Sequence, residues 1–119
     1  MASSYLTILE QLLKSVKGSL ASGFADYEGE TVEMAGSLDD YPHRLHLAYQ
    51  GIILHKLQQV HSTCGEAPSR ITLTFQNRHV VIQPLKSGYY LVLTLERGAN
   101  LYKAGRNLER TAQELNRDI

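Results

Sequence analysis

The sequence predicts a mixed α/β (α+β) domain built on a single antiparallel five-stranded sheet with helices on both faces. Three segments repeat apolar residues at spacings of three and four, which is typical of amphipathic helices. Five short runs rich in β-branched, aromatic or small residues are bounded by turn residues, which is typical of strands. Along the chain these elements follow the order αββαβββα.

The first half of the chain predicts a helix and a hairpin. Apolar residues from Ser4 to Val16 follow helical spacing, and Gly18 ends the helix. Residues 19–36, SLASGFADYEGETVEMAG, then predict two strands joined at Glu28 and Gly29, where glycine suits the positive φ of a tight turn.

The middle of the chain predicts one long helix. Asp39 and Asp40 precede Pro42, a pattern typical of a helix start with proline in the first turn. We expect this helix to run to about Cys64 and to stop at Gly65.

The last third predicts a three-stranded meander and a closing helix. The runs RITLTFQN and RHVVIQPL form a hairpin about Asn77, and a third strand runs from Tyr89 to Leu95. The closing helix extends from about Ala99 to Leu115. Its expected inner face is Leu101, Ala104, Leu108, Ala112 and Leu115.

Length and charge indicate one domain, residues 1–119, that folds without a metal or disulfide. Twelve basic and twelve acidic residues cancel, so no overall field favours nucleic acid or an anionic membrane. The single cysteine, Cys64, excludes an internal disulfide and fits a reducing compartment. The N-terminus is not a convincing signal peptide, and no apolar run approaches the roughly 18 residues of a membrane span. We therefore expect a cytoplasmic protein without membrane insertion.

The middle helix has two apolar faces. The broader one is expected to lie on the sheet; Lys56 falls inside it, so either its ammonium extends outward or the register of the helix differs slightly. It consists of Leu45, Tyr49, Ile52, Ile53, Leu57 and Val60. A second line lies nearly opposite and consists of Leu47, Gly51, Leu54 and Gln58. Either this line is an ordinary surface with a tolerated glycine, or Gly51, which costs about 1 kcal/mol of helix stability, lets another helix approach.

The strand RITLTFQN favours the second interpretation. Its side chains alternate, with Ile71, Leu73 and Phe75 expected to point inward. No charge or proline within the run would protect it as an edge, so if it lies at the edge of the sheet, pairing with a copy of itself would satisfy it. The sequence therefore predicts a homodimer, whose interface residues are Leu47, Gly51, Leu54, Gln58, Thr72, Thr74 and Gln76.

The five histidines suggest a metal site only weakly. His43 and His46 share a helix side, but zinc needs three or four converging ligands, and neither an HExxH motif nor a cysteine pair is present. We expect solvated or capping histidines and no bound metal. Cys64 and His61 are three residues apart and could form a reactive pair, although Cys64 also fits the end of an apolar stripe.

Two further features resemble chemical sites without their required residues. The acidic residues Asp26, Glu28, Glu30 and Glu33 lie on a hairpin, where a solvated turn is expected rather than an enclosed acid–base pair. The stretch GYYLVLTLERGANLYKAG, residues 88–105, joins a strand to a helix through glycine, but it contains neither a Walker nor a GxGxxG motif. We expect a simple turn, no cofactor and no catalytic residue.

Three features together resemble the roadblock dynein light-chain family. The hairpin GFADYEGETVEMAG is similar to the first hairpin of that family, and RHVVIQPLKSGYYLVLTLERGANLYKAGRNLERTA is similar to its closing strands and last helix. The αββαβββα order agrees over nearly all 119 residues, whereas the middle helix matches only in length and pattern.

The resemblance implies a roadblock/profilin-like homodimer that joins the two sheets through central strands, sets the middle helices side by side and binds proteins rather than catalysing reactions. For a prokaryotic member, it implies a Ras-like small GTPase as partner, bound across the paired middle helices. Arg97 or Arg106 could act in trans on that GTPase, but solvated surface arginines are the simpler interpretation. Two alternatives remain open. One is a structural adaptor without effect on nucleotide turnover, and the other is a small-molecule sensor with a cavity lined by Phe24, Tyr89 and Tyr90.

Overall fold

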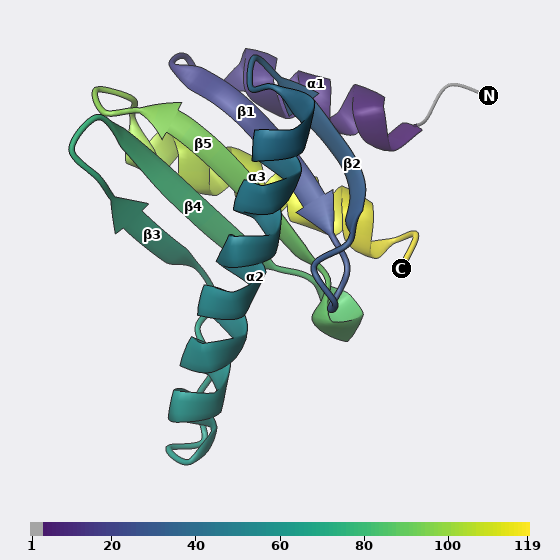
Figure 1. The fold of residues 1–119 in the computed structure, drawn as a ribbon, viewed down its shortest axis with the longest axis vertical. Coiled ribbons are helices and arrows are strands. Elements are labelled where there is room, and N and C mark those ends of the chain that lie inside the picture. Colours follow the sequence, from purple (N-terminus) through teal and green to yellow (C-terminus); the bar gives the residue numbers. More distant parts are fainter. Residues whose placement is uncertain (1–3) are drawn as a thin grey trace.

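The computed structural model describes residues 4–119, which form three helices and five strands in the predicted order αββαβββα (Figure 1). A short 3-10 turn, η1, is inserted before the last strand. The elements are α1 (Ser4–Ser15), β1 (Ser19–Ala25), β2 (Thr31–Gly36), α2 (Asp40–Ser62), β3 (Ile71–Thr74), β4 (Arg78–Pro84), η1 (Lys86–Gly88), β5 (Tyr90–Glu96) and α3 (Leu101–Asn116).

The strands form one antiparallel sheet in the order β2-β1-β5-β4-β3. Strands β1 and β5 are distant in sequence but pair at the centre, with Phe24 opposite Leu91. Strands β2 and β3 are the two edges, so the RITL run meets the condition on which its pairing with a copy of itself depends. The single five-stranded antiparallel sheet predicted from the sequence is therefore confirmed.

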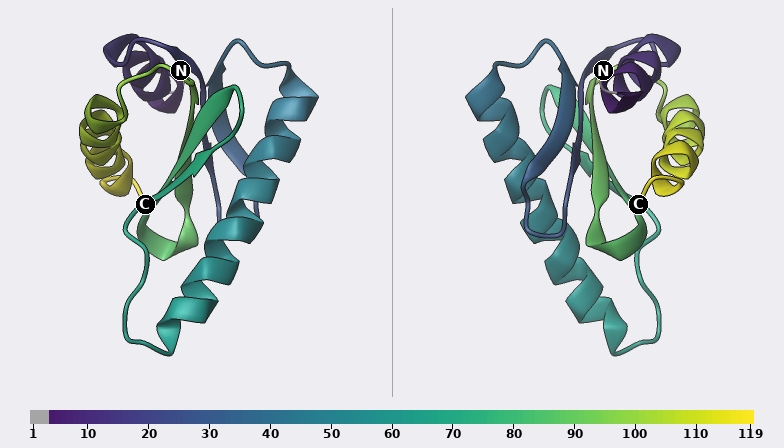
Figure 2. Two further views of the ribbon diagram at one scale, coloured as in Figure 1. Left: turned by 90° about the vertical axis from the view of Figure 1, so that its left-hand side faces the viewer. Right: turned by 90° about the vertical axis from the view of Figure 1, so that its right-hand side faces the viewer.

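Helices cover both faces of the sheet, as predicted (Figure 2). Helices α1 and α3 lie together on one face, where Leu9, Phe24, Leu93 and Leu108 belong to a buried cluster. Helix α2 lies on the other face over a second cluster that includes Tyr90. Because both faces are covered, β5 is almost entirely apolar and buried along its length.

The turns follow the predicted chemistry. Gly29 adopts φ +85° in the β1–β2 turn, a region that glycine enters without steric cost. The Asp26 carboxylate accepts hydrogen bonds from the N–H groups of Glu28 and Glu30 at 2.9 and 3.0 Å. At the β5–α3 corner, Asn100 caps α3 by accepting a hydrogen bond from the Lys103 N–H at 3.0 Å.

Two expectations about apolar residues are wrong. Phe75 does not point into the core but is 48% exposed, because β3 ends at Thr74 and the Phe75 N–H already bonds to Arg78 in the hairpin turn. Leu101 is 38% exposed because it begins α3 at the corner, one turn before the buried face. Within residues 4–119, no helix combines the length and apolarity needed to cross a bilayer.

Candidate functional site: an apolar ridge on the middle helix

Helix α2 packs on the sheet through the narrower of its two apolar faces. Leu47 and Leu54 are 0% and 1% exposed, and Gly51 is buried between them. All three residues are therefore covered by the sheet of the same copy. The prediction that Leu47, Gly51 and Leu54 form an exposed dimer interface is therefore wrong, while Gln58, further along this line, is half-buried.

Close packing at two positions, Gly23 and Tyr90, explains why the narrower apolar face of α2 lies against the sheet. A Cβ at Gly23 of β1 would lie 2.4 Å from a Leu47 methyl, so the helix approaches the sheet where β1 has no side chain. A Cβ at Gly51 would lie 2.3 Å from the Tyr90 hydroxyl oxygen. The missing side chain of Gly51 therefore makes room for the Tyr90 ring of β5, not for a helix of another copy.

The Tyr90 hydroxyl also fixes the helix by a hydrogen bond. It donates to the Leu47 carbonyl oxygen at 2.8 Å inside the buried cluster. Burial raises the pKa of Tyr90 to about 12, with a smaller contribution from the Asp26 carboxylate. The hydroxyl therefore keeps its proton and remains a donor throughout the neutral range.

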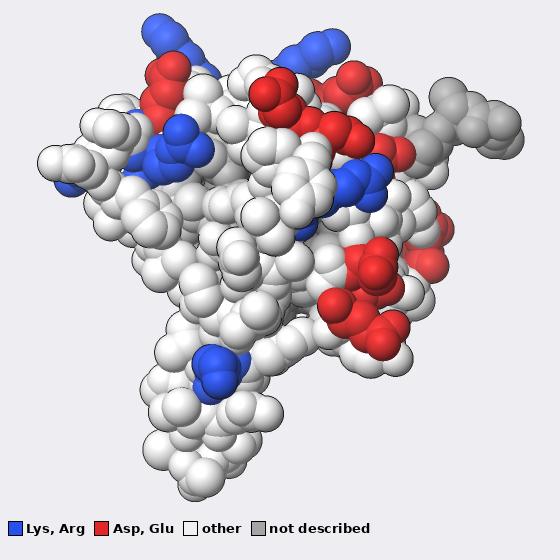
Figure 3. Space-filling view, in the orientation of Figure 1, with Lys and Arg blue, Asp and Glu red and all other residues white. Residues whose placement is uncertain are grey.

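Four of the six residues in the broader apolar stripe of α2 point away from the sheet, whereas Ile53 and Leu57 are half-buried and pack against the cluster under the helix. Leu45, Tyr49, Ile52 and Val60 are 40%, 55%, 52% and 64% exposed, and we call these four residues the α2 ridge. Figure 3 shows that the surface over α2 carries few charged side chains. Lys56 lies within the ridge and is exposed, so its ammonium meets water directly. Apolar side chains gathered on one exposed helix face make this ridge the candidate interaction surface of the chain.

The C-terminal half of α2 projects beyond the sheet (Figures 1 and 2). Residues 60–67 are exposed, and Ile53 and Leu57 are only half-buried. These last turns therefore present apolar side chains on more than one side of the helix, so a partner lying against the ridge would also meet this projecting part.

The outer edge of β3, one of the two edges of the sheet, offers backbone groups that β4 does not pair. Phe75 donates to the Arg78 carbonyl at 2.8 Å, and Thr74 is opposite His79 in the register with β4. Because hydrogen-bonded and non-hydrogen-bonded pairs alternate in an antiparallel ladder, the N–H and C=O groups of Thr72 and Thr74 point outward. The side chains of Thr72, Thr74 and Gln76 are exposed, as predicted.

A polar cluster lies under the N-terminal half of α2. His43 is 3% exposed, and His46 approaches Gln50 at 3.3 Å and Thr94 of β5 at 3.4 Å. Burial lowers the pKa of His43, helped by His46 and opposed by Asp40. Burial also lowers the pKa of His46, and Arg78 adds to the effect. Both rings are therefore held neutral.

Histidine burial departs from the expectation of solvated or capping rings. That expectation is wrong for His43 and also for His79, which is 6% exposed and bridges Thr74 (2.8 Å) and the Arg97 carbonyl (2.9 Å). Within residues 4–119, no three His, Cys, Asp or Glu side chains gather as metal ligands would. Cys64 and His61 are both exposed near the projecting end of α2.

The residues proposed for a sensor cavity are core residues. Tyr90 and Phe24 are 0% and 1% exposed, and the Phe24 ring packs against the Tyr89 ring with centroids 5.8 Å apart.

The two arginines that could act in trans on a GTPase are Arg97, which follows β5, and Arg106, which lies on α3. Arg97 donates to the carbonyls of Phe75 and Gln76 at 3.4 Å, whereas Arg106 is exposed on α3.

The fold matches solved structures closely, although no protein-family model and no curated protein matches the sequence. A Roadblock/LC7 domain from Streptomyces avermitilis aligns with a TM-score of 0.86 at 13% identity, over 92% of each chain. Myxococcus xanthus MglB aligns with a TM-score of 0.88 at 12% identity, over 98% of this chain and 94% of the other. A structure described as MglB with tetrameric arrangement aligns with a TM-score of 0.86 at 18% identity, over 98% and 91%.

These similarities define the chain as having the Roadblock/LC7 fold. The roadblock resemblance in the sequence is therefore confirmed at the level of the fold. The prediction that the broad stripe lies on the sheet is wrong for the four ridge residues, whereas Ile53 and Leu57 of the same stripe pack partly against it. Lys56 within the broad stripe was the signal that this stripe faces water.

Proposed function

We propose that this chain is a non-enzymatic homodimeric module that binds and regulates a Ras-like small GTPase across its α2 helices. The observation that carries the proposal is the α2 ridge, an uncovered apolar face on a helix that projects beyond its sheet. The MglB-like fold and the described tetrameric arrangement of one MglB support self-association.

The β3 edge supports the way in which two copies meet. If β3 pairs with β3 of a second copy about a twofold axis perpendicular to the sheet, both α2 helices lie on the same face of the joined sheet. Such an isologous contact uses the same patch on both copies. It would bring the two ridges together and leave their outer flanks for a third protein, which is where we place the GTPase.

Light scattering during size exclusion tests the dimer. Wild type should elute at twice the chain mass of 13.3 kDa, and Ile52→Glu should shift it to the monomer, because a buried unpaired charge opposes association. Thr7→Glu adds the same charge on exposed α1 and should leave the dimer intact. A monomeric wild type at micromolar and higher concentration contradicts the proposal.

The partner is tested with the Ras-like GTPase encoded nearest to this chain. Nucleotide release and GTP hydrolysis are measured with and without the wild type and with Ile52→Glu. A change in either rate that Ile52→Glu abolishes supports regulation. Binding without any change in turnover shows instead a structural adaptor, and no binding contradicts the choice of partner.

A further inference from the structure

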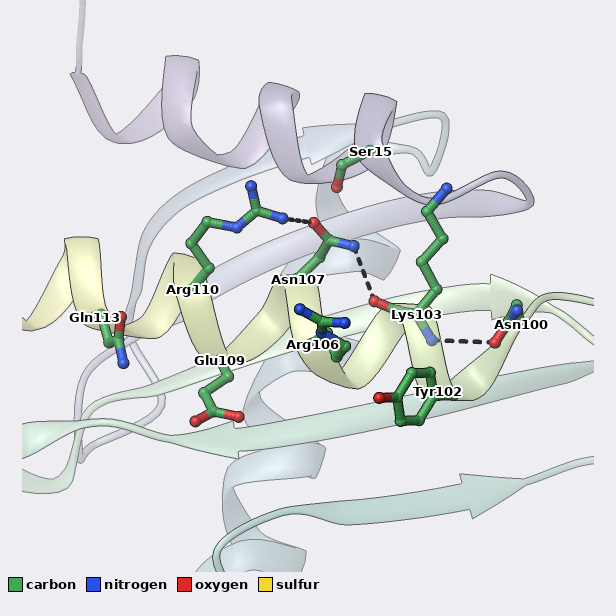
Figure 4. Close-up of a pocket in the computed structure, with 9 residues that line it drawn as sticks. All are labelled: Ser15, Asn100, Tyr102, Lys103, Arg106, Asn107, Glu109, Arg110 and Gln113. Carbon is green, nitrogen blue, oxygen red and sulfur yellow. Dashed lines mark hydrogen bonds between the residues drawn. The ribbon is translucent and has the colours of Figure 1, made fainter.

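A groove lies along α3 beside the end of α1, on the side of the sheet opposite α2, and we call it the α1–α3 groove. Its main hollow has a volume of about 1000 Å³ and is lined along α3 from Asn100 to Gln113, with Ser15 contributed by α1. Figure 4 shows Lys103 and Arg110 extending toward α1 on either side of Asn107. A second hollow of about 440 Å³ continues past Lys103 and adds one base, Lys17, and one acid, Glu96.

The main hollow is basic. Lys103, Arg106 and Arg110 line it together with a single acid, Glu109, which is engaged by Arg70 at 3.8 Å. Within residues 4–119, neither Lys103 nor Arg106 forms an ion pair. Asn107 is held on the groove floor, since it donates to the Lys103 carbonyl at 2.9 Å and accepts a hydrogen bond from Arg110. The main hollow therefore offers an excess of positive charge around a fixed asparagine.

The β1–β2 hairpin carries the opposite charge. Residues 19–36 contain four acidic residues, Asp26, Glu28, Glu30 and Glu33, and no lysine or arginine. At the tip, Glu28 and Glu30 are exposed and Tyr27 is 61% exposed. The Asp26 carboxylate and Gly29 hold the turn by local hydrogen bonds, so the tip loses little conformational freedom when it binds.

The acidic tip and the basic groove of one copy do not contact each other. Strand β1 runs from the end of α1, beside the groove, to the hairpin tip, so the length of the strand separates them (Figure 1). The formal net charge is zero, so no overall repulsion keeps copies apart. Opposite charges at separate ends therefore favour contact between different copies.

We propose that the acidic β1–β2 tip of one copy docks into the basic α1–α3 groove of another copy. This head-to-tail contact is heterologous and leaves a free tip and a free groove at its ends, so it continues into larger assemblies. Tyr27 of the tip and Tyr102 at the groove, 61% and 75% exposed, add apolar contact area. The contact uses neither the α2 ridge nor β3, so it does not depend on the proposed dimer.

Charge reversal on each side tests the contact. The groove variant is Lys103→Glu/Arg106→Glu, and the tip variant is Glu28→Lys/Glu30→Lys; all four side chains are exposed. Sedimentation velocity compares each with wild type at about 0.01 M and about 1 M NaCl, between which the Debye length falls from about 30 to about 3 Å. Wild type should assemble beyond the dimer only at low salt. Each variant should raise the dissociation constant of this assembly at least about tenfold.

Mixing the two variants is the decisive step. The reversed groove then matches the reversed tip, and the remaining native groove and tip also match, so the mixture should assemble as wild type does. The control Lys86→Glu/Arg117→Glu makes the same charge change at exposed positions outside the groove and should assemble normally.

Three results would overturn the proposal: no salt-sensitive assembly of the wild type, reversed variants that assemble normally, or a mixture that stays apart. Ile52→Glu separates this result from the α2 dimer, since it should abolish the dimer while the low-salt assembly persists.

Discussion

The Tyr90 hydroxyl of β5 donates a hydrogen bond to the Leu47 carbonyl of α2 at 2.8 Å, one turn before Gly51 leaves space for the tyrosine ring. This contact joins the central part of the sheet to the helix that carries the candidate interaction surface. It sets the distance between α2 and β5, and the helix can rotate only if the buried hydroxyl loses its partner. The position of the α2 ridge thus depends on a tyrosine in the core.

Tyr90→Phe should lower the free energy of unfolding by about 1 kcal/mol, the usual contribution of one intramolecular hydrogen bond. The ring remains to fill the core, so the loss should not reach the cost of a cavity. Urea unfolding followed by circular dichroism measures it. Tyr89→Phe, at a half-buried neighbour whose ring packs on Phe24, is the matched control and should change stability by less than about 0.5 kcal/mol.

Gly51→Ala should destabilise the fold although alanine is the better helix former. The new Cβ would lie 2.3 Å from the Tyr90 hydroxyl oxygen and 2.7 Å from a ring carbon. Overpacking costs about 1–3 kcal/mol, against a gain of about 1 kcal/mol in helix propensity. The urea midpoint should fall for Gly51→Ala and recover in part in Gly51→Ala/Tyr90→Phe. A stabilised Gly51→Ala would show that α2 does not lie this close to β5.

The buried histidines under α2 should make the protein less stable in mild acid. Burial holds the pKa of both His43 and His46 below the ordinary value of 6.5. As the pH falls through 6.5, the unfolded chain therefore takes up protons before the folded chain does, and the free energy of unfolding decreases. The loss continues down to the lowered pKa values, and at higher pH these two groups contribute no slope.

Urea unfolding between about pH 5 and pH 8 checks this pH dependence. His43→Gln/His46→Gln should flatten the part of the profile below pH 6.5, and His61→Gln, exposed on the same helix, should keep the wild-type shape. A profile in which stability rises as the pH falls through this range would mean that the two rings gain protons on folding, contrary to their burial beside Arg78 and each other.

Much of the fold could be predicted from local patterns. The alternation in RITL identified β3 as a strand, whereas its place at the edge of the sheet, which the sequence offered only as a condition for pairing, follows from the sheet order. The acidic hairpin was predicted with its turn at Gly29, because glycine at positive φ is a local requirement. Such features depend on residues close together in the chain.

The orientation of α2 could not be predicted in this way. The helix has two apolar faces, and the number of apolar residues favours the wrong one. The correct choice depends on Gly23 and Tyr90, which meet α2 only in the folded sheet. The polar cluster could not be predicted for the same reason, because His46 and Thr94 are 48 positions apart in the sequence and meet only in the folded chain.

Thr74→Pro should weaken association of two copies while leaving the monomer folded. The Thr74 N–H points away from β4, so proline removes an outward donor at the edge rather than a ladder hydrogen bond. Light scattering over a dilution series should show a dissociation constant raised at least about tenfold, and circular dichroism should remain unchanged. Thr74→Ala is the control, because it loses the side-chain bond to His79 but keeps the N–H. Equal dimerisation of both variants would show that copies do not pair through β3.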